Sequence, residues 1–596
     1  MRLRAALRDY RRHEGHETRF PGERRTTTGL FTGDASRLVH VSPDGSLRDF
    51  GYPLSQVSGL SRCRLGVERD GEVTWFVGGE QSYHEDTTLV VTDHEVDSHR
   101  VRQYDRTVDG VHLTHVGWAD APADARLVAV AAFEPDGREG RVGQLRHGDA
   151  VELYHAREHD FLASATGFDA VESRPNWLGD VLAGREPAET AAGRYEESRL
   201  TGLVEVSVPF EDGTVTLGTH LTTSADRDAA LERIRAAVGR ASTARFRDAP
   251  AVPAAEREDV ADVVEACVTA DLRVLSLLSA PTGLRMAGPE FDPFYAHSGG
   301  YGYTWFRDDS EIARFLLHAG RRLDVGRGAW HAQSARRYVE TQRDDGTWPH
   351  RVWPADGSLA PGWANARLEA GDDVAYQADQ TGSVAAFLAD YLPDAPADLR
   401  EPLVETLTGA VDGLDDSLAA DGRPVVCQNA WENMDGRFTH TAAAFLHGYS
   451  AAVTATALPD AVRDHARAQA TRVYDALDDL WVGDHYALRE RPDDSVDDRV
   501  DSATFALAGA HRSYHAAVGV DDRRLNRLIE HVDTAVDALR RGTDAVTGLI
   551  RFEGDDWRCR EQAGEKVWTV STGGPRAPVS NSPNCWRRSR IHAPRR

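Results

Sequence analysis

The chain has 596 residues, of which 41% are hydrophobic, so it is long enough for two or more domains with sizeable cores. Its 95 acidic residues outnumber the 69 basic ones, and the formal net charge is −26. A surface that carries so many carboxylates repels nucleic acid and anionic membranes, which excludes both as expected partners.

One lysine, Lys566, stands among the basic residues, and the rest are arginines. Together with the acid excess, this is typical of haloarchaeal proteins, because dense surface carboxylates keep a chain hydrated at high salt. No apolar run approaches 18 residues, and the amino terminus lacks the apolar core of a signal peptide. The five cysteines show no CxxC or zinc spacing. We therefore expect a cytoplasmic protein without a metal or cofactor.

Residues 1–245 are predicted to form an antiparallel β-sandwich. They contain short segments rich in Val, Leu, Thr and aromatic residues, which are separated by Asp-Gly turn pairs. Asp212-Gly213 stands between Leu203–Phe210 and Thr214–Thr222, a pattern typical of a β-hairpin. Many short strands with regular turns favour a sandwich over other folds.

Helical periodicity begins after Pro250 and Pro253. Residues 246–290 are assigned to a linker and a first helix, which keeps one face apolar from Val260 to Leu278. Residues 291–572 are predicted to form an all-helical toroid whose loops build a site. Its helices are expected near 309–319, 326–341, 380–392, 399–418, 440–455, 459–479, 500–517 and 521–540.

Two short motifs carry the chemistry. Gly299–Asp308 places four aromatic rings beside the pair Arg307-Asp308, just before a predicted helix, and Trp431-Glu432 follows about 120 residues later. Aromatic rings cover the apolar faces of sugars, while Arg and Asp form charged hydrogen bonds with hydroxyl groups. For the first motif alone, a buried aromatic cluster with a structural ion pair is an equal alternative.

With both motifs at this spacing, the chain resembles glycoside hydrolase family 15, the glucoamylases, over nearly all of residues 1–572. The resemblance implies an N-terminal β-sandwich followed by an (α/α)6 barrel, as in prokaryotic members. It also implies an exo-acting, inverting hydrolase that releases glucose from the non-reducing ends of α-glucans or maltooligosaccharides. These sugars are then the expected partners, and the oligomeric state stays open.

The resemblance also implies roles for individual residues. Glu432 is the expected general acid, and Tyr301 is expected to face the developing oxocarbenium centre. Arg307 and Asp308 would bind the 4- and 6-hydroxyls of the terminal glucose, with Trp305 packed near the same subsite. The other implied substrate-binding residues are Gln377, Asp379, Trp431 and Arg551. For Gln377, Asp379 and Arg551, a purely structural role is an equal alternative.

The C-terminal segment departs from the family. An inverting glycosidase needs a second carboxyl as general base, about 6.5–9.5 Å from the acid, and the resemblance places it downstream of Trp568. Residues 573–596 hold six arginines and several prolines but no acidic residue. We therefore expect an aberrant basic tail from a truncated or frameshifted gene end, an incomplete barrel and a missing base. The alternative is a genuine basic tail that binds an acidic partner.

Other functions remain open on the sequence alone. Glucodextranase and trehalase are alternatives within the same family, which act on α-1,6 and α-1,1 bonds. An inverting disaccharide phosphorylase would use one glutamate and phosphate, and Arg307-Asp308 argues against it. A non-catalytic remnant that binds glycans would turn over no sugar.

Overall fold

The computed structural model describes most of the chain and divides it into two compact units. The first comprises residues 1–304, 319–326 and 352–361, and the second comprises 305–318, 327–351 and 362–596. The described residues are 26, 28–138, 142–173, 201–252, 262–290, 301–323, 328–360, 377–432, 434–542, 546–556, 566–568 and 571.

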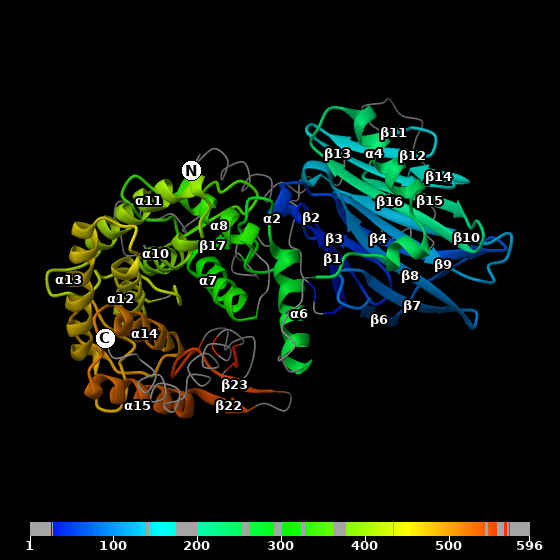
Figure 1. Cartoon of the computed structure of the whole chain (residues 1–596). Coiled ribbons are helices and arrows are strands. Elements are labelled where there is room, and N and C mark those ends of the chain that lie inside the picture. Colours follow the sequence, from blue (N-terminus) through cyan, green and yellow to red (C-terminus); the bar gives the residue numbers. More distant parts are fainter. Residues whose placement is uncertain are drawn as a thin grey trace. The chain divides into compact units, whose positions relative to one another are not determined.

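The first unit is built on two antiparallel sheets (Figure 1). One sheet has the strand order β1-β2-β3-β4-β10-β15-β14, with β5 paired to β4, and its strands are β1 (Leu30–Asp34), β2 (Arg37–Val41), β3 (Leu47–Asp49), β4 (Leu60–Arg69), β5 (Glu72–Trp75), β10 (Arg126–Phe133), β14 (Ala170–Ser173) and β15 (Leu203–Pro209). The other has the order β11-β12-β13-β16-β9-β8-β7-β6, and its strands are β6 (Gly79–Tyr83), β7 (Val90–Val96), β8 (His99–Val108), β9 (Val111–Gly117), β11 (Gly143–Arg146), β12 (Ala150–His155), β13 (Glu158–Ser164) and β16 (Thr214–Thr222).

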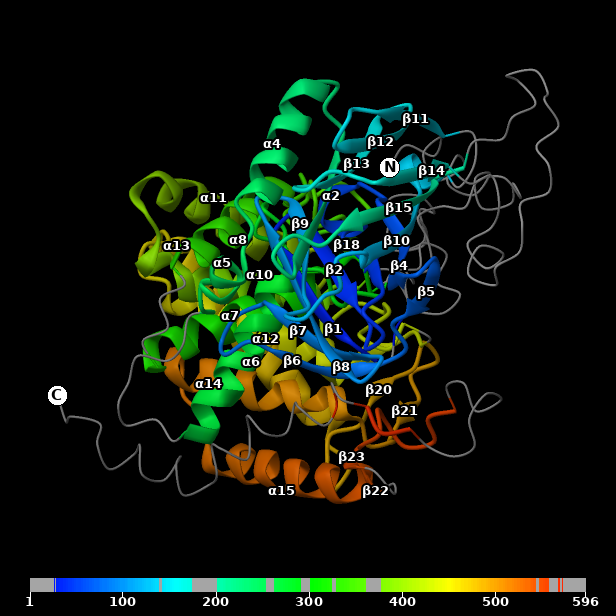
Figure 2. The same ribbon diagram turned by 90° about the vertical axis from the view of Figure 1, so that its right-hand side faces the viewer.

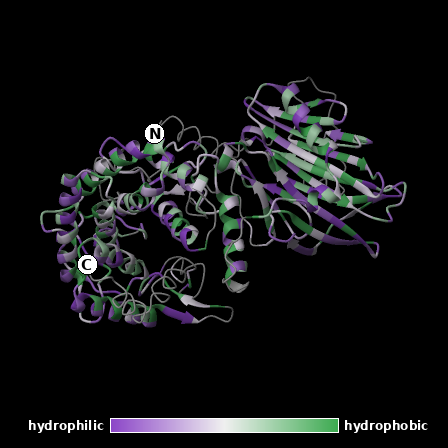
Figure 3. Cartoon of the chain, viewed as in Figure 1, coloured by the Kyte–Doolittle hydropathy of each residue, from purple (hydrophilic) through white to green (hydrophobic). Residues whose placement is uncertain are grey.

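Alternating side chains create the sandwich core. In β15 the buried Val206 and Val208 flank the half-buried Ser207, and apolar and polar residues alternate in the same way along other strands (Figure 3). Because successive side chains of a strand point to opposite faces, the apolar ones of both sheets meet in one core. The unit also contains α2 (Tyr52–Ser55), the 3-10 helix η1 (Pro135–Gly137), α4 (Arg227–Gly239), α5 (Thr243–Arg247) and α6 (Asp262–Leu278).

The predicted hairpin between β15 and β16 is wrong, although its turn is present. Asp212 and Gly213 have φ values of 49° and 69°, and Glu211 and Thr214 exchange two backbone hydrogen bonds of 2.9 Å. Beyond the turn, however, β15 pairs with β10 and β14, whereas β16 pairs with β13 and β9. Both strands bury apolar residues in the same core from opposite sheets, and burial therefore overrides the local hairpin pattern.

Helices dominate the second unit (Figures 1 and 2). They are α7 (Phe306–Leu323), α8 (Gly328–Thr341), α10 (Asp379–Tyr391), α11 (Ala397–Asp415), α12 (Thr439–Thr454), α13 (Asp460–Ala476), α14 (Ala506–Ala517) and α15 (Asp522–Leu539). Between them lie η4 (Leu392–Asp394), η5 (Leu477–Leu480), η6 (Ser502–Phe505) and the short strands β17 (Thr304–Trp305), β18 (Arg351–Val352), β19 (Arg437–Phe438), β20 (Arg489–Glu490), β21 (Val496–Asp497), β22 (Arg540–Gly542) and β23 (Thr547–Leu549). These bounds confirm the predicted helices to within a few residues at most ends.

Burial separates an inner from an outer set of helices. Nearly every residue of α10 and α12 is buried, whereas α11 and α13 bury one face only. A helix that is buried all round belongs to the interior, and an amphipathic one covers it. From α10 to α13 the chain therefore alternates between inner and outer helices, as the predicted toroid requires.

Two glycines allow α10 and α12 to approach closely. A Cβ atom on Gly382 would lie 2.3 Å from the Ala444 carbonyl oxygen, and one on Gly448 would lie 2.9 Å from Gly382 Cα. Glycine is the only residue that fits such a crossing. The close packing fixes the start of α10, which carries Asp379, against α12, which begins at Thr439.

The predicted aberrant tail, residues 573–596, lies outside the described residues. Within the described part of the chain, no helix is both long enough and apolar enough to cross a lipid bilayer.

Candidate active site

A buried ion pair joins the first turn of α7 to the start of α10. Arg307 Nη1 donates hydrogen bonds to Gln377 Oε1 at 2.7 Å and to Asp379 Oδ2 at 3.0 Å. Burial by itself raises the pKa of Asp379, but Arg307 and His440 more than offset it, so the pKa is lowered and Asp379 stays ionised. The structure thus brings together three of the residues that the sequence implied.

Asp308 also faces Arg307, but it is more exposed than Asp379. Its carboxylate is 3.6 Å from Arg307 Nη2 and its side chain is 44% exposed, whereas that of Asp379 is fully buried. Adjacent residues at a helix start therefore differ in role: Arg307 is held by the protein, and Asp308 remains accessible to a ligand.

Glu432 lies in a tight turn before α12. Its φ angle is 62°, a left-handed conformation that is uncommon for a residue with a side chain, and its N–H donates to the Asn429 carbonyl at 3.1 Å. Strained backbone of this kind concentrates at functional sites. Burial raises the pKa of Glu432 to about 7, although the nearby Arg307 and Arg351 act in the opposite direction. A carboxyl that holds its proton near neutral pH, and whose side chain is still 26% exposed, is equipped to act as an acid.

Sequence reasoning missed two neighbours of Glu432. His350 Nε2 lies 3.6 Å from Glu432 Oε1, and the His350 ring packs edge-on against Trp305 with 4.8 Å between centroids. The Arg351 guanidinium is fully buried, 5.1 Å from the Trp305 ring centroid. The Trp305 ring thus lies near the guanidinium groups of both Arg307, at 5.9 Å, and Arg351. His350 and Arg351 reach the site from the end of the loop after α8 and the start of β18.

Several buried polar atoms around this cluster have no hydrogen-bond partner within the described residues. They are Asp379 Oδ1, Asn429 Nδ2 and His440 Nδ1. Burial lowers the pKa of His440, so its ring is neutral and can donate or accept. Since buried polar groups are nearly always hydrogen-bonded in folded proteins, an alternation of donors and acceptors here fits a ligand with several hydroxyl groups.

Arg551 packs against Trp431, the residue before Glu432. The Arg551 guanidinium is 5.4 Å from the Trp431 ring centroid and 4.6 Å from that of Trp568. It also donates two hydrogen bonds to Asp555, at 2.8 and 2.6 Å, and is only 5% exposed. Arg551 is thus close to the candidate acid, and its predicted contact with a second sugar stays a prediction.

Tyr301 belongs to the first unit, where its side chain is 45% exposed. Its predicted place, facing the developing oxocarbenium centre, stays a prediction. The predicted loss of the general base concerns residues that lie outside the described part of the chain.

Among the residues that the structure describes, no cluster of His, Cys, Asp or Glu is arranged to hold a metal ion.

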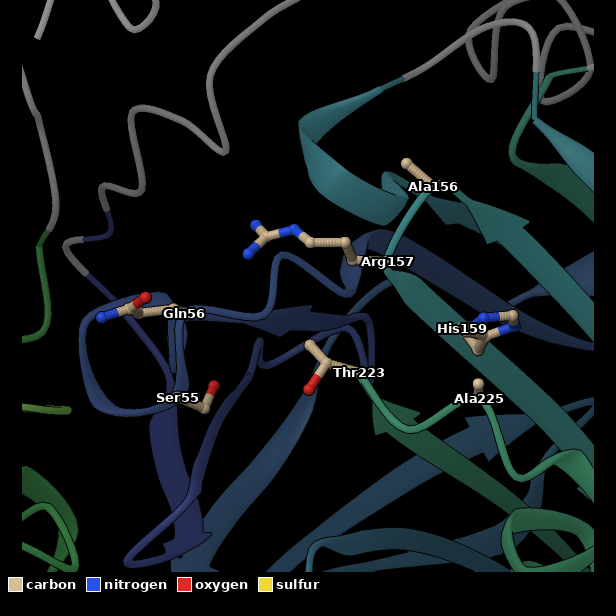
Figure 4. A pocket seen from close by; sticks show the side chains of 7 residues that line it. All are labelled: Ser55, Gln56, Ala156, Arg157, His159, Thr223 and Ala225. Carbon is tan, nitrogen blue, oxygen red and sulfur yellow. The ribbon is translucent and has the colours of Figure 1, made fainter. Parts of the chain in front are cut away.

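A separate pocket of about 460 Å³ lies in the first unit (Figure 4). Its lining is mostly polar and comprises Ser55, Gln56, Ala156, Arg157, His159, Thr223 and Ala225. No aromatic side chain other than the imidazole of His159 lines it. It does not resemble the aromatic and charged cluster around Glu432.

Comparison with known proteins supports the fold. Residues 1–231 match a protein family described as "Domain of unknown function (DUF7997)". No curated protein matches the chain in sequence.

Among solved structures, a bacterial glucoamylase complexed with acarbose is similar over 94% of this chain and 87% of its own, with a TM-score of 0.64 and 11% identity. A family GH92 α-mannosidase from Bacteroides thetaiotaomicron aligns over 81% of this chain and 66% of its own, with a TM-score of 0.43 and 9% identity. The likeness to the glucoamylase confirms the predicted fold class, an antiparallel β-sandwich followed by an α/α-barrel type of helical domain.

Proposed function

We propose that the protein is a glycoside hydrolase of the glucoamylase type, an exo-acting and inverting α-glucosidase with Glu432 as general acid. The observation that carries this proposal is the setting of Glu432. A partly exposed carboxyl whose pKa is about 7 stands beside buried donors and acceptors that have no hydrogen-bond partner among the described residues. Cleavage of a glycosidic bond needs such an acid to protonate the leaving oxygen.

The neighbouring residues have distinct roles in this proposal. Asp308 and Arg307 bind hydroxyls of the terminal sugar, and the fixed ion pair with Asp379 holds the guanidinium in one orientation. Trp305 supplies an apolar face beside them, and Gln377 and Asp379 offer their remaining polar atoms. A closed arrangement of this kind admits the end of a chain and excludes its middle, which is the basis of exo action.

Hydrolysis of maltose, isomaltose and trehalose at molar salt tests the function, with NMR detection of the anomer first released. In a version of the chain that carries a general base, we expect maltose to be the best substrate and β-glucose to appear first, because an inverting enzyme converts the α-linkage into a β-product. Without that base, little or no turnover is expected. Preference for isomaltose or trehalose would instead indicate a glucodextranase or a trehalase. Calorimetric binding of acarbose without turnover of any sugar would indicate a non-catalytic glycan-binding protein.

The pH dependence of turnover should report the pKa of Glu432. Because the acid must be protonated in the free enzyme, kcat/KM is expected to be constant below about pH 6 and to fall about tenfold per pH unit above the pKa of about 7. The profile is measured with maltose at constant ionic strength, since salt screens nearby charges. A basic limb that begins near pH 4.5 would mean that burial does not raise this pKa.

A further inference from the structure

Asp501 is a buried carboxylate in the loop between β21 and η6. Its Oδ1 atom accepts two hydrogen bonds, one from the Ala503 backbone N–H at 3.0 Å and one from the Trp431 indole Nε1–H at 2.7 Å. The first bond caps η6, and the second connects this loop to the residue that precedes Glu432. One oxygen atom therefore links two segments that lie 70 residues apart in sequence.

The other sides of Trp431 are also restrained. Its backbone N–H donates to Asn429 Oδ1 at 3.0 Å, and its ring lies against Arg551 and Phe552, with centroid distances of 5.4 Å to the guanidinium and 6.3 Å to the phenyl ring. Among the described residues, Asp501 is the hydrogen-bond partner of the indole. Removal of Asp501 would leave a buried N–H without an acceptor, and the ring would have to move or find water.

Movement of Trp431 matters because Glu432 has a left-handed backbone. Residues with side chains leave this conformation unless their surroundings hold them in it. The segment from Asn429 to Glu432 is a short turn, so the orientation of one peptide group sets the next. A loosened indole would therefore release Glu432 from the position beside His350 and Arg307.

We propose that Asp501 is a positioning residue for the general acid: its hydrogen bond to the Trp431 indole keeps Glu432 in its turn. The catalytic consequence rests on the proposed function, whereas the positioning does not. Burial raises the pKa of Asp501 to about 7, against its bonds from Ala503 and Trp431 and the nearby charges of Arg499 and Arg551. Both the ionised and the neutral acid keep Oδ1 as an acceptor, so the hydrogen bond survives across this pH range.

The test uses the full chain with ¹⁵N-labelled tryptophan and ¹³Cδ-labelled glutamate. The variants are Asp501→Ala, Asp501→Asn, Trp431→Phe and the double variant Asp501→Ala/Trp431→Phe, with Glu432→Gln for assignment. Asparagine keeps an acceptor in place of Oδ1, and phenylalanine keeps a smaller aromatic ring but removes the indole N–H. NMR records the pH midpoint of Glu432 in every variant that keeps this glutamate, and the Trp431 indole resonance in every variant that keeps this tryptophan.

We expect Asp501→Ala to shift the indole resonance and to lower the Glu432 midpoint by about 1 unit, because a looser turn admits water. Asp501→Asn should retain both values. In the double variant, the Glu432 midpoint should fall no further than in either single variant. Such non-additivity is the signature of one shared interaction. The titratable and charged groups that face Glu432, namely Arg307, Asp308, His350, Arg351 and Asp379, are unchanged in all variants.

A matched control is Asp309, an equally buried carboxylate of α7 that accepts a hydrogen bond from the Tyr338 hydroxyl at 2.5 Å. Asp309→Ala should lower stability without altering the Trp431 resonance. If Asp501→Ala, or Trp431→Phe where the first fails to fold, leaves the Glu432 midpoint unchanged, the proposal is wrong. It is equally wrong if Asp501→Asn behaves as Asp501→Ala.

Turnover separates this inference from the proposed function. In an active enzyme, kcat/KM of Asp501→Ala should fall about 10²-fold, mostly through kcat, since a displaced acid still permits binding. If the unmodified chain hydrolyses no α-glucoside but the Glu432 midpoint still moves with Asp501, the positioning role stands and the proposed function fails.

Discussion

Replacement of Glu432 by glutamine is expected to lower kcat for maltose by about 10²–10⁴, the usual contribution of general acid catalysis. The substitution keeps the size of the side chain and removes only its proton donor. Acarbose affinity should change much less, because Arg307, Asp379 and Trp305 keep their positions. Steady-state kinetics and calorimetry on the same preparation measure the two effects.

Glu490 provides the control for this experiment. It is a buried glutamate on β20, paired with Arg423 and Arg437 rather than with the residues of the site. Glu490→Gln should reduce stability and leave kcat nearly unchanged. Activity of Glu432→Gln within a few-fold of the unmodified enzyme would exclude Glu432 as the acid.

Periodicity predicted the helical unit well because each helix there buries a continuous face. The stretch predicted at 459–479 is α13, and the one at 521–540 is α15, each within a few residues. The β unit was harder, since strands pair with partners far away in sequence. Asp212-Gly213 specified a tight reversal, but nothing in its neighbourhood specified that β15 and β16 belong to different sheets.

The site was predicted only where a motif marks it. Arg307 and Glu432 lie in recognisable sequence patterns, and the structure brings both close to Gln377 and Asp379. His350 and Asn429 lie in loops and Arg351 begins the two-residue strand β18, so no periodic pattern distinguishes them from their neighbours. Asp501 carries only the signal of a helix cap, Asp-Ser before a helical run, and its second bond to Trp431 depends on the tertiary fold.

Replacement of Arg307 by methionine is expected to have the second large effect, on stability and on binding together. Asp379 is fully buried, and Arg307 is the first-ranked of the charges that hold its pKa low. Loss of one partner of a buried ion pair typically costs about 3–5 kcal/mol of the free energy of unfolding. Asp379 would then bind a proton more readily, so the stability that this carboxylate contributes above its unfolded pKa would be lost at higher pH than before. Chemical unfolding between pH 4 and pH 8 measures both changes.

A second ion pair between the same two helices isolates the role of the site. Arg314, two turns after Arg307 on α7, donates to Asp390 of α10 at 2.7 Å, and both side chains are more exposed than those of Arg307 and Asp379. Arg314→Met should therefore cost less stability and leave acarbose affinity unchanged. The double change Arg307→Met/Asp379→Leu should recover part of the stability, because no buried charge is then left unpaired, but it should not restore binding. Recovery of acarbose affinity in that double variant would show that Arg307 and Asp379 only hold α7 against α10, and would remove them from the candidate active site.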